Sequence, residues 1–510
     1  MCLTLAIRRV HHMHSYLRRF HWRRQRVHPS RQVASDSCAD QPVMPNQPSP
    51  GRDCLRRPRR LATPVLASLL SLLVTSVLIS CSSRSTSPAS AENEGSGADT
   101  APAGLPSFYS VPSRLHPASP GTLVGYQRVD TPALHAATYR VMYHSRSVTG
   151  KDVIVTGLVA VPQTSPPTAG YPVISWGHGT DGQADSCAPS LRPDDFGDLG
   201  ASQANFLLDR GYELTATDYE GLGTPGRPPY LVGVSEARGT IDIVRAARHI
   251  PLAHASDRYL VWGHSEGGQA ALFALHIAGQ WAPELHLVGV VAGAPPSQLT
   301  LLYQAVKASP FKHHILMVIA GFNAAYGDKA APLDQVLTAA GQKALGVLDT
   351  TCQLYAATQA LNFAALTRSD PATVPAWRSL LDANDAGRFT TPAHTPLLII
   401  QGSDDQEIPA VSTQLLFSQL CSKGQVSQRW LYPGQSHTGV LAASLADMTT
   451  WMAHRFAGLP APDPMTPRDV SPLAPSRGHA PTGPTNATSV RTSSSPSSPA
   501  APVTTTSCPT

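Results

Sequence analysis

The chain has 510 residues, of which 42% are hydrophobic, enough for a substantial buried core. Only 14% are charged and 47 are prolines, and these prolines crowd toward the two ends, where we expect little folded structure. Much of the formal net charge of +5 comes from arginines within the first 60 residues. Because no nucleic-acid-binding module accompanies these arginines, we do not expect nucleic acid as a partner.

The amino-terminal part is typical of an export signal. Arginines at 56, 57, 59 and 60 precede an apolar run from Leu61 to Ile79, which ends at Ser80-Cys81. The ending Leu78-Ile79-Ser80-Cys81 resembles the lipobox of bacterial lipoproteins, which implies cleavage before Cys81 and lipidation of its thiol. A transmembrane anchor is the alternative, because the run is long enough to span a bilayer.

Met44 begins a conventional-looking leader, so we interpret residues 44–81 as a lipoprotein-type signal peptide. Residues 1–43 are then a non-native or disordered extension. The Ser/Ala/Gly-rich residues 82–104 are expected to be a flexible linker. With either anchor the rest of the chain is extracytoplasmic, in the cell envelope on a lipid anchor or secreted. Residues 459–510 are rich in Pro, Ser and Thr, and we predict a disordered tail there.

The folded region is predicted to be 105–458, where short apolar strands alternate with helices. The expected strands are 152–162, 172–177, 213–219, 258–263, 287–294, 396–402 and 428–434. The expected helices are 201–211, 235–250, 267–281 and 441–458. This alternation predicts an α/β fold with a mainly parallel central sheet and helices on both faces.

Residues 297–395 interrupt this alternation with about a hundred residues of little strand character. Their apolar runs predict helices at 299–309, 313–327, 332–348, 352–366 and 375–385. An insertion at this point would lie over the carboxyl ends of the strands, where α/β active sites lie. We therefore predict a helical cap or lid, with a separate unrelated domain as the alternative.

The stretch Gly263-His264-Ser265-Glu266-Gly267 matches the pattern G-x-S-x-G. It lies between a predicted strand and a predicted helix, which is the setting of a nucleophile elbow. The glycines remove side chains where strand and helix nearly touch, and the sharp turn exposes the serine hydroxyl. Ser265 is therefore the candidate nucleophile.

A serine nucleophile needs a base, and the base needs an acid to orient it, here in the chain order Ser, acid, His. The acidic turn after strand 396–402 favours Asp405 over its neighbour Asp404, with Glu407 as a minor contender. His437 follows the last predicted strand and is the candidate base. The other downstream histidine, His454, lies inside the last predicted helix.

The oxyanion of an acyl-transfer transition state needs two preorganised N–H donors. One is predicted to be the backbone N–H of Glu266, which follows the nucleophile. The other should come from the turn after strand 172–177, where Thr180 is the first choice and Gly179 the second. The adjacent His178 is interpreted as a structural residue that pins the loop.

The folded region contains the cysteines Cys187, Cys352 and Cys421, and an exported protein can form one disulfide among them. Cys508 falls in the predicted tail. The cysteine and histidine spacings fit no zinc site, and no cofactor-binding or metal-binding motif is present, so we expect neither a cofactor nor a metal.

Taken together, the motifs resemble those of the secretory lipases, a family that includes Candida lipase A-like and actinobacterial members. The motifs are "GYPVISWGHGTDG", "CAPS", "TDYEGLGTPGRPPYLVG", "GHSEGGQAAL", "IIQGSDDQEIP" and "YPGQSHTGV", and they span about 105–458. The resemblance implies an α/β-hydrolase fold with a helical cap and interfacial ester hydrolysis by Ser265, Asp405 and His437. It also implies a disulfide between Cys187 and Cys352, which leaves the state of Cys421 open.

These observations predict a serine ester hydrolase, a triacylglycerol lipase or carboxylesterase, that acts through an acyl-enzyme on esters of apolar acyl chains. The expected partners are an ester or lipid substrate and a membrane reached through the lipid anchor. Two alternatives stay open. One is an acyltransferase or peptidase on the same fold, and the other is a non-catalytic envelope lipoprotein.

Overall fold

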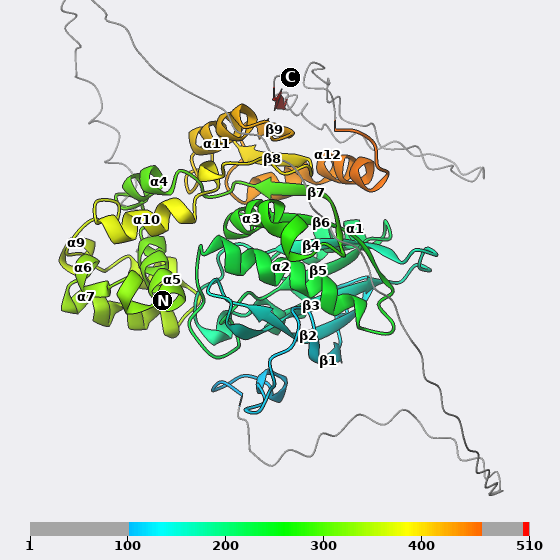
Figure 1. The fold of residues 1–510 in the computed structure, drawn as a ribbon, viewed down its shortest axis with the longest axis horizontal. Helices are drawn as coiled ribbons and strands as arrows, with labels where there is room; N and C mark the ends of the chain where they lie inside the picture. Colours follow the sequence, from blue (N-terminus) through cyan, green and yellow to red (C-terminus); the bar gives the residue numbers. More distant parts are fainter. Residues whose placement is uncertain (1–100, 462–502, 509–510) are drawn as a thin grey trace, which may run out of the picture. The chain divides into compact units, whose positions relative to one another are not determined.

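The structure, a computed structural model, describes residues 101–461 and 503–508, and within them a central sheet has ten strands (Figure 1). The strands are β1 Leu123–Val129, β2 Ala136–Arg146, β3 Asp152–Pro162, β4 Tyr171–Gly177, β5 Glu213–Thr217, β6 Ala255–His264, β7 His286–Gly293, β8 Leu397–Gly402, β9 Ser427–Tyr432 and β10 Thr504–Ser507. Their order across the sheet is β1-β2-β3-β5-β4-β6-β7-β8-β9-β10.

The middle of the sheet is parallel, as predicted, and its edges are not. Strands β4 to β9 all run in one direction. Strands β1, β2 and β3 form an antiparallel meander that joins the parallel part through β5, and β10 is antiparallel to β9. The sequence did not predict β1, β2 or β10. The predicted mainly parallel α/β fold is confirmed.

Helices cover the sheet on both faces because the parallel strands are apolar on both sides. In β6, Leu260 and Trp262 pack toward α1 (Ala201–Leu208) and α12 (Gly439–Phe456). The alternate residues Tyr259 and Val261 pack toward the opposite layer. That layer consists of α2 (Gly233–Arg248), α3 (Glu266–Trp281) and α11 (Ala410–Ser422). The near-continuous apolar run of such a strand is the sequence signature of burial on both faces.

A helical cap lies between β7 and β8, as the sequence predicts for 297–395. Its helices are α4 Leu299–Val306, α5 His313–Ala330, α6 Leu333–Val336, α7 Ala339–Ala344, α8 Leu354–Thr358, α9 Phe363–Leu366 and α10 Pro375–Ala383. Figure 1 shows them gathered at one side of the sheet. Their shared core includes Tyr230, Leu231 and Val232, which belong to the loop between β5 and α2. This shared core argues against a separate unrelated domain.

Two predicted cap helices, 332–348 and 352–366, are wrong as continuous helices. The first breaks at Thr338, whose Oγ1 accepts a hydrogen bond from the Gly341 N–H at 3.1 Å and caps a new helix, α7. Leu337 forms a β-bridge to Thr367, which ties the break in the first segment to the end of the second. The bridge joins residues 30 positions apart, so no local sequence pattern predicts it.

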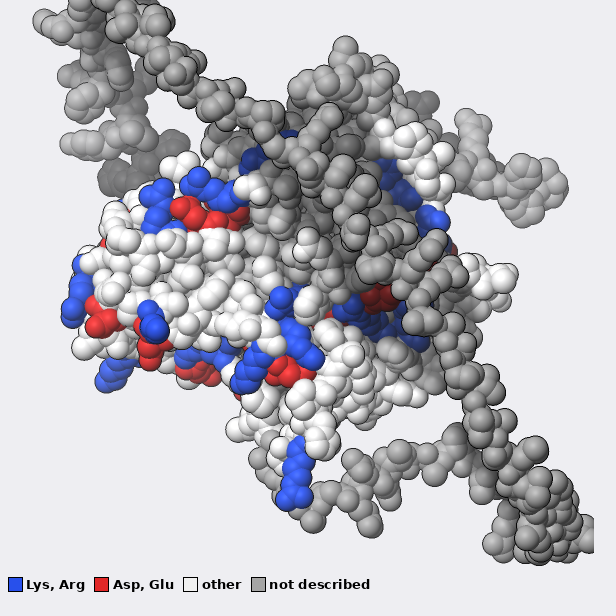
Figure 2. Space-filling view, in the orientation of Figure 1, with Lys and Arg blue, Asp and Glu red and all other residues white. Residues whose placement is uncertain are grey.

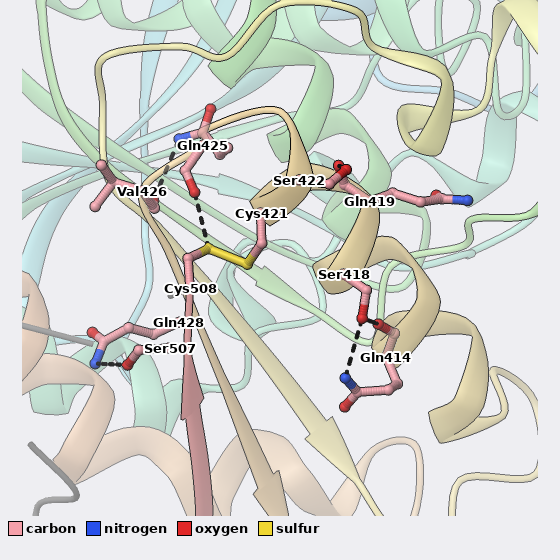
Figure 3. Close-up of a disulfide and its surroundings, with 10 residues drawn as sticks. All are labelled: Gln414, Ser418, Gln419, Cys421, Ser422, Gln425, Val426, Gln428, Ser507 and Cys508. Atoms are coloured by element: carbon pink, nitrogen blue, oxygen red, sulfur yellow. Dashed lines mark hydrogen bonds between the residues drawn. A yellow bond between two sulfur atoms is a disulfide. The ribbon is translucent and has the colours of Figure 1, made fainter. Parts of the chain in front are cut away.

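The predicted disorder of 459–510 is wrong for residues 503–508. Thr504–Ser507 pair with Gln428–Leu431 as the edge strand β10. The next residue, Cys508, is disulfide-bonded to Cys421 at the end of α11 (Figure 3). The sequence interpretation placed one disulfide among the three cysteines of the folded region. The structure has that one, between Cys187 and Cys352, and adds the bond that occupies Cys421.

Removing the Cys421–Cys508 bond is expected to lower the free energy of unfolding. The bond closes a loop with a sequence separation of 87 residues, and a disulfide of that span stabilises by about 2–5 kcal/mol, mainly by restricting the unfolded chain. The measurement is urea denaturation of the oxidised parent and of a Cys421→Ser/Cys508→Ser double variant, in which no free thiol remains at this site. Equal unfolding midpoints in the two proteins would contradict the prediction.

The described residues contain no helix long and apolar enough to cross a membrane. The apolar run 61–79, the extension 1–43, the proposed signal peptide 44–81 and Cys81 all lie outside the described residues. So do residues 82–100 of the predicted linker and 462–502 of the predicted tail.

Candidate active site

The turn between β6 and α3 holds Ser265 in a strained conformation. Its φ is 55° and its ψ is −121°, in a region that L-residues other than glycine rarely occupy. The strand ends at His264 and the helix begins at Glu266, so the reversal falls on the serine itself. The Ser265 N–H donates to the Gly293 carbonyl at the end of β7, 2.8 Å away, which anchors the turn to the neighbouring strand. The geometry is that of a nucleophile elbow.

Two glycines make this turn possible. A Cβ on Gly263 would lie 1.9 Å from the Gly267 carbonyl oxygen, and a Cβ on Gly267 would lie 1.9 Å from the carbonyl oxygen of Gly177 in β4. The obstructing atoms are backbone atoms of strands and helix, which cannot move aside. The start of α3 therefore packs directly on the ends of β4 and β6.

Gly267→Ala is expected to prevent folding or to cost several kcal/mol, because a methyl group has no space against the Gly177 backbone. The matched control is Gly279→Ala in the same helix, where a Cβ meets nothing within 4 Å. That change should stabilise the protein by about 0.5–1 kcal/mol through helix propensity. Thermal unfolding and soluble yield of both variants check the pair. If the Gly267→Ala variant unfolded at the same temperature as the parent, the packing argument would be contradicted.

The carboxyl-end loops of β8 and β9 bring Asp405 and His437 together. His437 Nδ1 lies 2.7 Å from Asp405 Oδ2, and both residues are buried. Asp405 Oδ1 accepts the backbone N–H groups of Glu407 and Ile408 at 2.9 and 2.8 Å, and Gln401 Nε2 donates to Oδ2 at 2.9 Å. The carboxylate is thus fixed on both oxygens.

Hydrogen bonding keeps Asp405 ionised. Burial alone raises its pKa, but the hydrogen bond and charge of His437, with the bonds from Ile408 and Gln401, outweigh burial and hold the pKa below its usual value. The neighbouring Asp404 is exposed, and its Oδ1 accepts a hydrogen bond from Ser403 Oγ. Of the two carboxylates considered from sequence, Asp405 is the one that contacts the histidine.

The residue before Ser265 packs on the imidazole of His437. The ring centroids of His264 and His437 are 4.7 Å apart, which brings the elbow and the histidine loop together. Within residues 101–461, however, Ser265 Oγ makes no hydrogen bond to His437. Such catalytic contacts are often long in unliganded enzymes and tighten when substrate binds.

The loop after β4 lies beside the elbow. A Cβ on Gly179 would be 3.8 Å from the Ser265 Cβ, so the backbone of 179–180 borders the candidate nucleophile. His178 is buried, its Nδ1 lies 2.6 Å from the Gly179 carbonyl, and its ring packs on Tyr219 with centroids 4.3 Å apart. These contacts agree with a structural role for His178. Thr180 and Gly179 stay the candidates for the second oxyanion donor.

Sequence reasoning missed a buried carboxyl pair under the elbow, formed by Glu266 and Glu236. Burial raises both pKa values, that of Glu236 to about 8, and the nearby Glu236 charge further raises that of Glu266. Glu236 Oε1 accepts a hydrogen bond from the Leu231 N–H at 2.7 Å. Its Oε2 is buried without a donor, and it can bond to Glu266 only if one of the two carboxyl groups carries a proton. The pair is therefore held at less than its full charge near neutral pH.

Glu407, weighed from sequence as a minor candidate for the acid, takes a different position. Its Oε2 lies 4.0 Å from His437 Nε2 and 4.0 Å from Nε2 of His314 in the cap. Asp405 occupies the Nδ1 side of the same His437 ring. Glu407 thus lies between the candidate base and helix α5, and burial raises its pKa.

A surface hollow of about 970 Å³ is remote from these residues. It is lined by the beginnings of β6 and β7 and by the segment before β8, including Asp257, His286 and His394. In a parallel sheet these are the amino ends of the strands, opposite the carboxyl ends that carry Ser265, Asp405 and His437. No cluster of possible metal ligands occurs in residues 101–461 or 503–508.

A mainly parallel sheet with a strained serine after its central strand, and an Asp–His pair after its later strands, defines the α/β-hydrolase class. The chain belongs to the secretory lipase family, whose model matches residues 203–463. Family and fold therefore agree with the resemblance seen in the sequence motifs.

Similar proteins carry lipase and esterase names. The chain is 28% identical over 298 residues to a secreted triacylglycerol lipase of Malassezia globosa and 24% identical over 257 residues to lipase A of Moesziomyces aphidis. The aligned parts are 54% and 47% of this chain, and they span 64% and 53% of those relatives. A Mycobacterium tuberculosis protein named "probable inactive lipase" is 25% identical, with 70% of this chain and 83% of the relative aligned.

Solved structures give the same fold. Candida antarctica lipase A in its closed state superposes with a TM-score of 0.60 at 21% identity, covering 67% of this chain and 84% of the other. A rice cell wall degrading esterase of Xanthomonas oryzae superposes with a TM-score of 0.52 at 18% identity, covering 67% and 97%.

Proposed function

We propose that the protein is an exported serine ester hydrolase that cleaves carboxylic esters of apolar acyl chains, as a triacylglycerol lipase or carboxylesterase, through an acyl-enzyme. The observation that carries the proposal is the 2.7 Å contact between His437 Nδ1 and the ionised Asp405, beside a serine held at a positive φ. Family membership and the lipase names of the relatives support the reaction class.

In this mechanism His437 Nε2 accepts the Ser265 hydroxyl proton while Oγ attacks the ester carbonyl. The backbone N–H groups of Glu266 and Thr180, with Gly179 as the alternative second donor, receive the oxyanion. His437 then donates the proton to the leaving alcohol. Water, deprotonated by His437, attacks the acyl-enzyme, and collapse of the second oxyanion releases the acid and the free serine. Asp405 holds the Nδ1–H tautomer and stabilises the imidazolium.

A small apolar pocket in the cap, with a volume of about 60 Å³, offers an apolar surface for part of an acyl chain and would have to widen to take a longer one. Side chains of α4, α5 and α10 line it, among them Leu302, Val306 and Val318, together with His314. The same His314 faces Glu407, which faces His437, so the pocket lies close to the proposed base. Figure 2 shows a broad uncharged surface over the cap, bordered by mixed acidic and basic side chains.

Two functions other than ester hydrolysis stay open as alternatives. An acyltransferase or peptidase would use the same residues on another acceptor or acyl group. A protein without lipase activity has a precedent in the Mycobacterium tuberculosis relative named "probable inactive lipase". The presence of Ser265, Asp405 and His437 together favours an active enzyme over that alternative.

The extracytoplasmic location is part of the proposal. The secretory family and the two disulfides support export, because disulfides persist in oxidising compartments. Lipidation of Cys81, which lies outside the described residues, would hold the enzyme at the membrane. Mass spectrometry of the mature amino terminus tests the anchor, and an unmodified chain that begins elsewhere would contradict it.

The reaction is tested with a fluorophosphonate probe and a substrate panel of p-nitrophenyl esters, triglycerides and peptides. We expect labelling that depends on Ser265 and turnover of the esters. Absence of labelling would favour the binding lipoprotein. Cleavage of peptides without turnover of esters would favour the peptidase.

A further inference from the structure

Several contacts join the loop after β4 to the cap, although the two are far apart in sequence. Gln183 Nε2 donates to the Met317 carbonyl of α5 at 3.3 Å and to the Pro228 carbonyl at 3.1 Å. The Cys187–Cys352 disulfide fixes the end of this loop to the cap covalently. The loop proposed to carry an oxyanion donor is thus built against the cap as well as against the sheet.

Tyr230 makes the contact nearest to the reaction centre. Its hydroxyl lies 2.9 Å from Thr180 Oγ1 and 3.0 Å from His314 Nδ1, and its ring is nearly parallel to the His314 ring, with an interplanar angle of 10°. The tyrosine is buried, so both hydrogen bonds replace lost contacts with water. Its hydroxyl therefore bridges the oxyanion loop and helix α5.

Helix α5 is also pressed onto the Tyr230 backbone. A Cβ on Gly321 would lie 2.5 Å from the Tyr230 nitrogen, so only a glycine allows this approach. The Tyr230 backbone and α5 therefore pack in direct contact. Thr180, in contrast, stands in a loop with glycines at 177, 179 and 182, which restrict the backbone little. Its orientation then depends on side-chain contacts such as the one to Tyr230.

We propose that Tyr230 is a positioning residue that holds Thr180 for oxyanion binding and makes this placement depend on the docking of cap helix α5. The inference rests on the proposed ester hydrolysis. Tyr230 itself touches no reacting atom in this mechanism. It acts through Thr180, so its loss should slow acylation rather than weaken substrate binding.

The test is Tyr230→Phe, which removes the hydroxyl and keeps the ring that packs in the cap. Losing an oxyanion donor outright lowers kcat about 10²–10³-fold. A donor that is only displaced should lose less, so we expect kcat to fall about 10–100-fold with little change in KM. Steady-state kinetics on a soluble p-nitrophenyl ester and the pre-steady-state acylation rate measure the effect.

Tyr326→Phe is the matched control, because Tyr326 is another cap tyrosine whose hydroxyl accepts a hydrogen bond from Asn384 Nδ2 at 3.0 Å. It should leave kcat unchanged. Thr180→Val removes the partner hydroxyl, which also hydrogen-bonds the Glu266 carboxyl, so it should lower kcat at least as much as Tyr230→Phe. The double variant should lose no more than Thr180→Val alone. His314→Asn places an amide where Nδ1 lies and should retain most of the activity that His314→Leu loses.

Equal kcat in Tyr230→Phe and the parent, or additive losses in the double variant, would overturn the inference. So would equal losses in Tyr230→Phe and Tyr326→Phe, since these would report general loosening of the cap. A parent protein that reacts with no ester would overturn the proposed function itself, which the parent assay decides before any variant is compared.

Discussion

Ser265→Ala is expected to lower kcat for ester hydrolysis by roughly 10⁶-fold and to abolish fluorophosphonate labelling, because removing the nucleophile of a serine triad costs about that much. The residual rate comes from substrate binding and the oxyanion donors alone. Alanine at position 265 must adopt the same positive φ as serine, so the backbone strain of the turn is unchanged in the variant. The measurement is single-turnover kinetics with active-site titration of the parent.

The control for this variant is a serine outside the proposed triad. Ser297 is buried, and its Oγ donates a hydrogen bond to the Ser412 carbonyl at 3.4 Å. Ser297→Ala should change kcat less than two-fold and stability by about 1 kcal/mol at most. If Ser265→Ala kept parental ester turnover, the nucleophile assignment would fail, and with it the acyl-enzyme mechanism.

The chemistry of the site was accessible from sequence because α/β-hydrolase topology orders it. A strand, a sharp glycine turn and a helix are local features, so Ser265 could be recognised from a few neighbours. The order Ser, acid, His then restricted the search to the turns after two later strands. The contact between Asp405 and His437 is what that order predicts. Glycine-rich turns and apolar strands can be recognised from the local sequence, and they predict where most of the strands begin and end.

The edge strand β10 could not be predicted in the same way. Thr504–Ser507 lies in a stretch whose Pro-, Ser- and Thr-rich composition is that of a disordered tail. What fixes the segment is pairing with β9 and the bond from Cys508 to Cys421, 87 residues away. Such a partner can be found only in three dimensions. Cys421 and Cys508, both without an assigned partner in the sequence interpretation, were the sequence features that pointed toward it.

The contacts around the proposed triad could not be predicted from the sequence either. Tyr230 and His314 are 84 residues apart and meet because α5 docks on the loop before α2. The Glu236–Glu266 pair joins two neighbouring helices, and nothing in either helix alone marks its glutamate as buried. Packing of the cap and of α2 against α3 creates both features. Local periodicity therefore predicts the elements but not the polar contacts between them.

Asp404→Asn and Asp405→Asn form a matched pair that tests the choice of acid. Asp404 is exposed and contacts Ser403, so its replacement should change kcat less than two-fold. Asp405 is buried and contacts His437, so its replacement should be severe. Opposite results in the two variants would assign the acid to Asp404.

Asp405→Asn is expected to lower kcat about 10⁴-fold, the loss associated with the wrong histidine tautomer in a triad. The surroundings of the carboxylate dictate this result. The N–H groups of Glu407 and Ile408 require an acceptor at the Oδ1 position, so the asparagine oxygen must lie there. The amide NH₂ then faces His437 Nδ1, which can only accept from it. The ring proton moves to Nε2, the atom that should accept the proton of Ser265. ¹⁵N-NMR of the His437 ring at neutral pH should show Nδ1–H in the parent and Nε2–H in the variant. An unchanged tautomer combined with parental kcat would remove Asp405 from the mechanism.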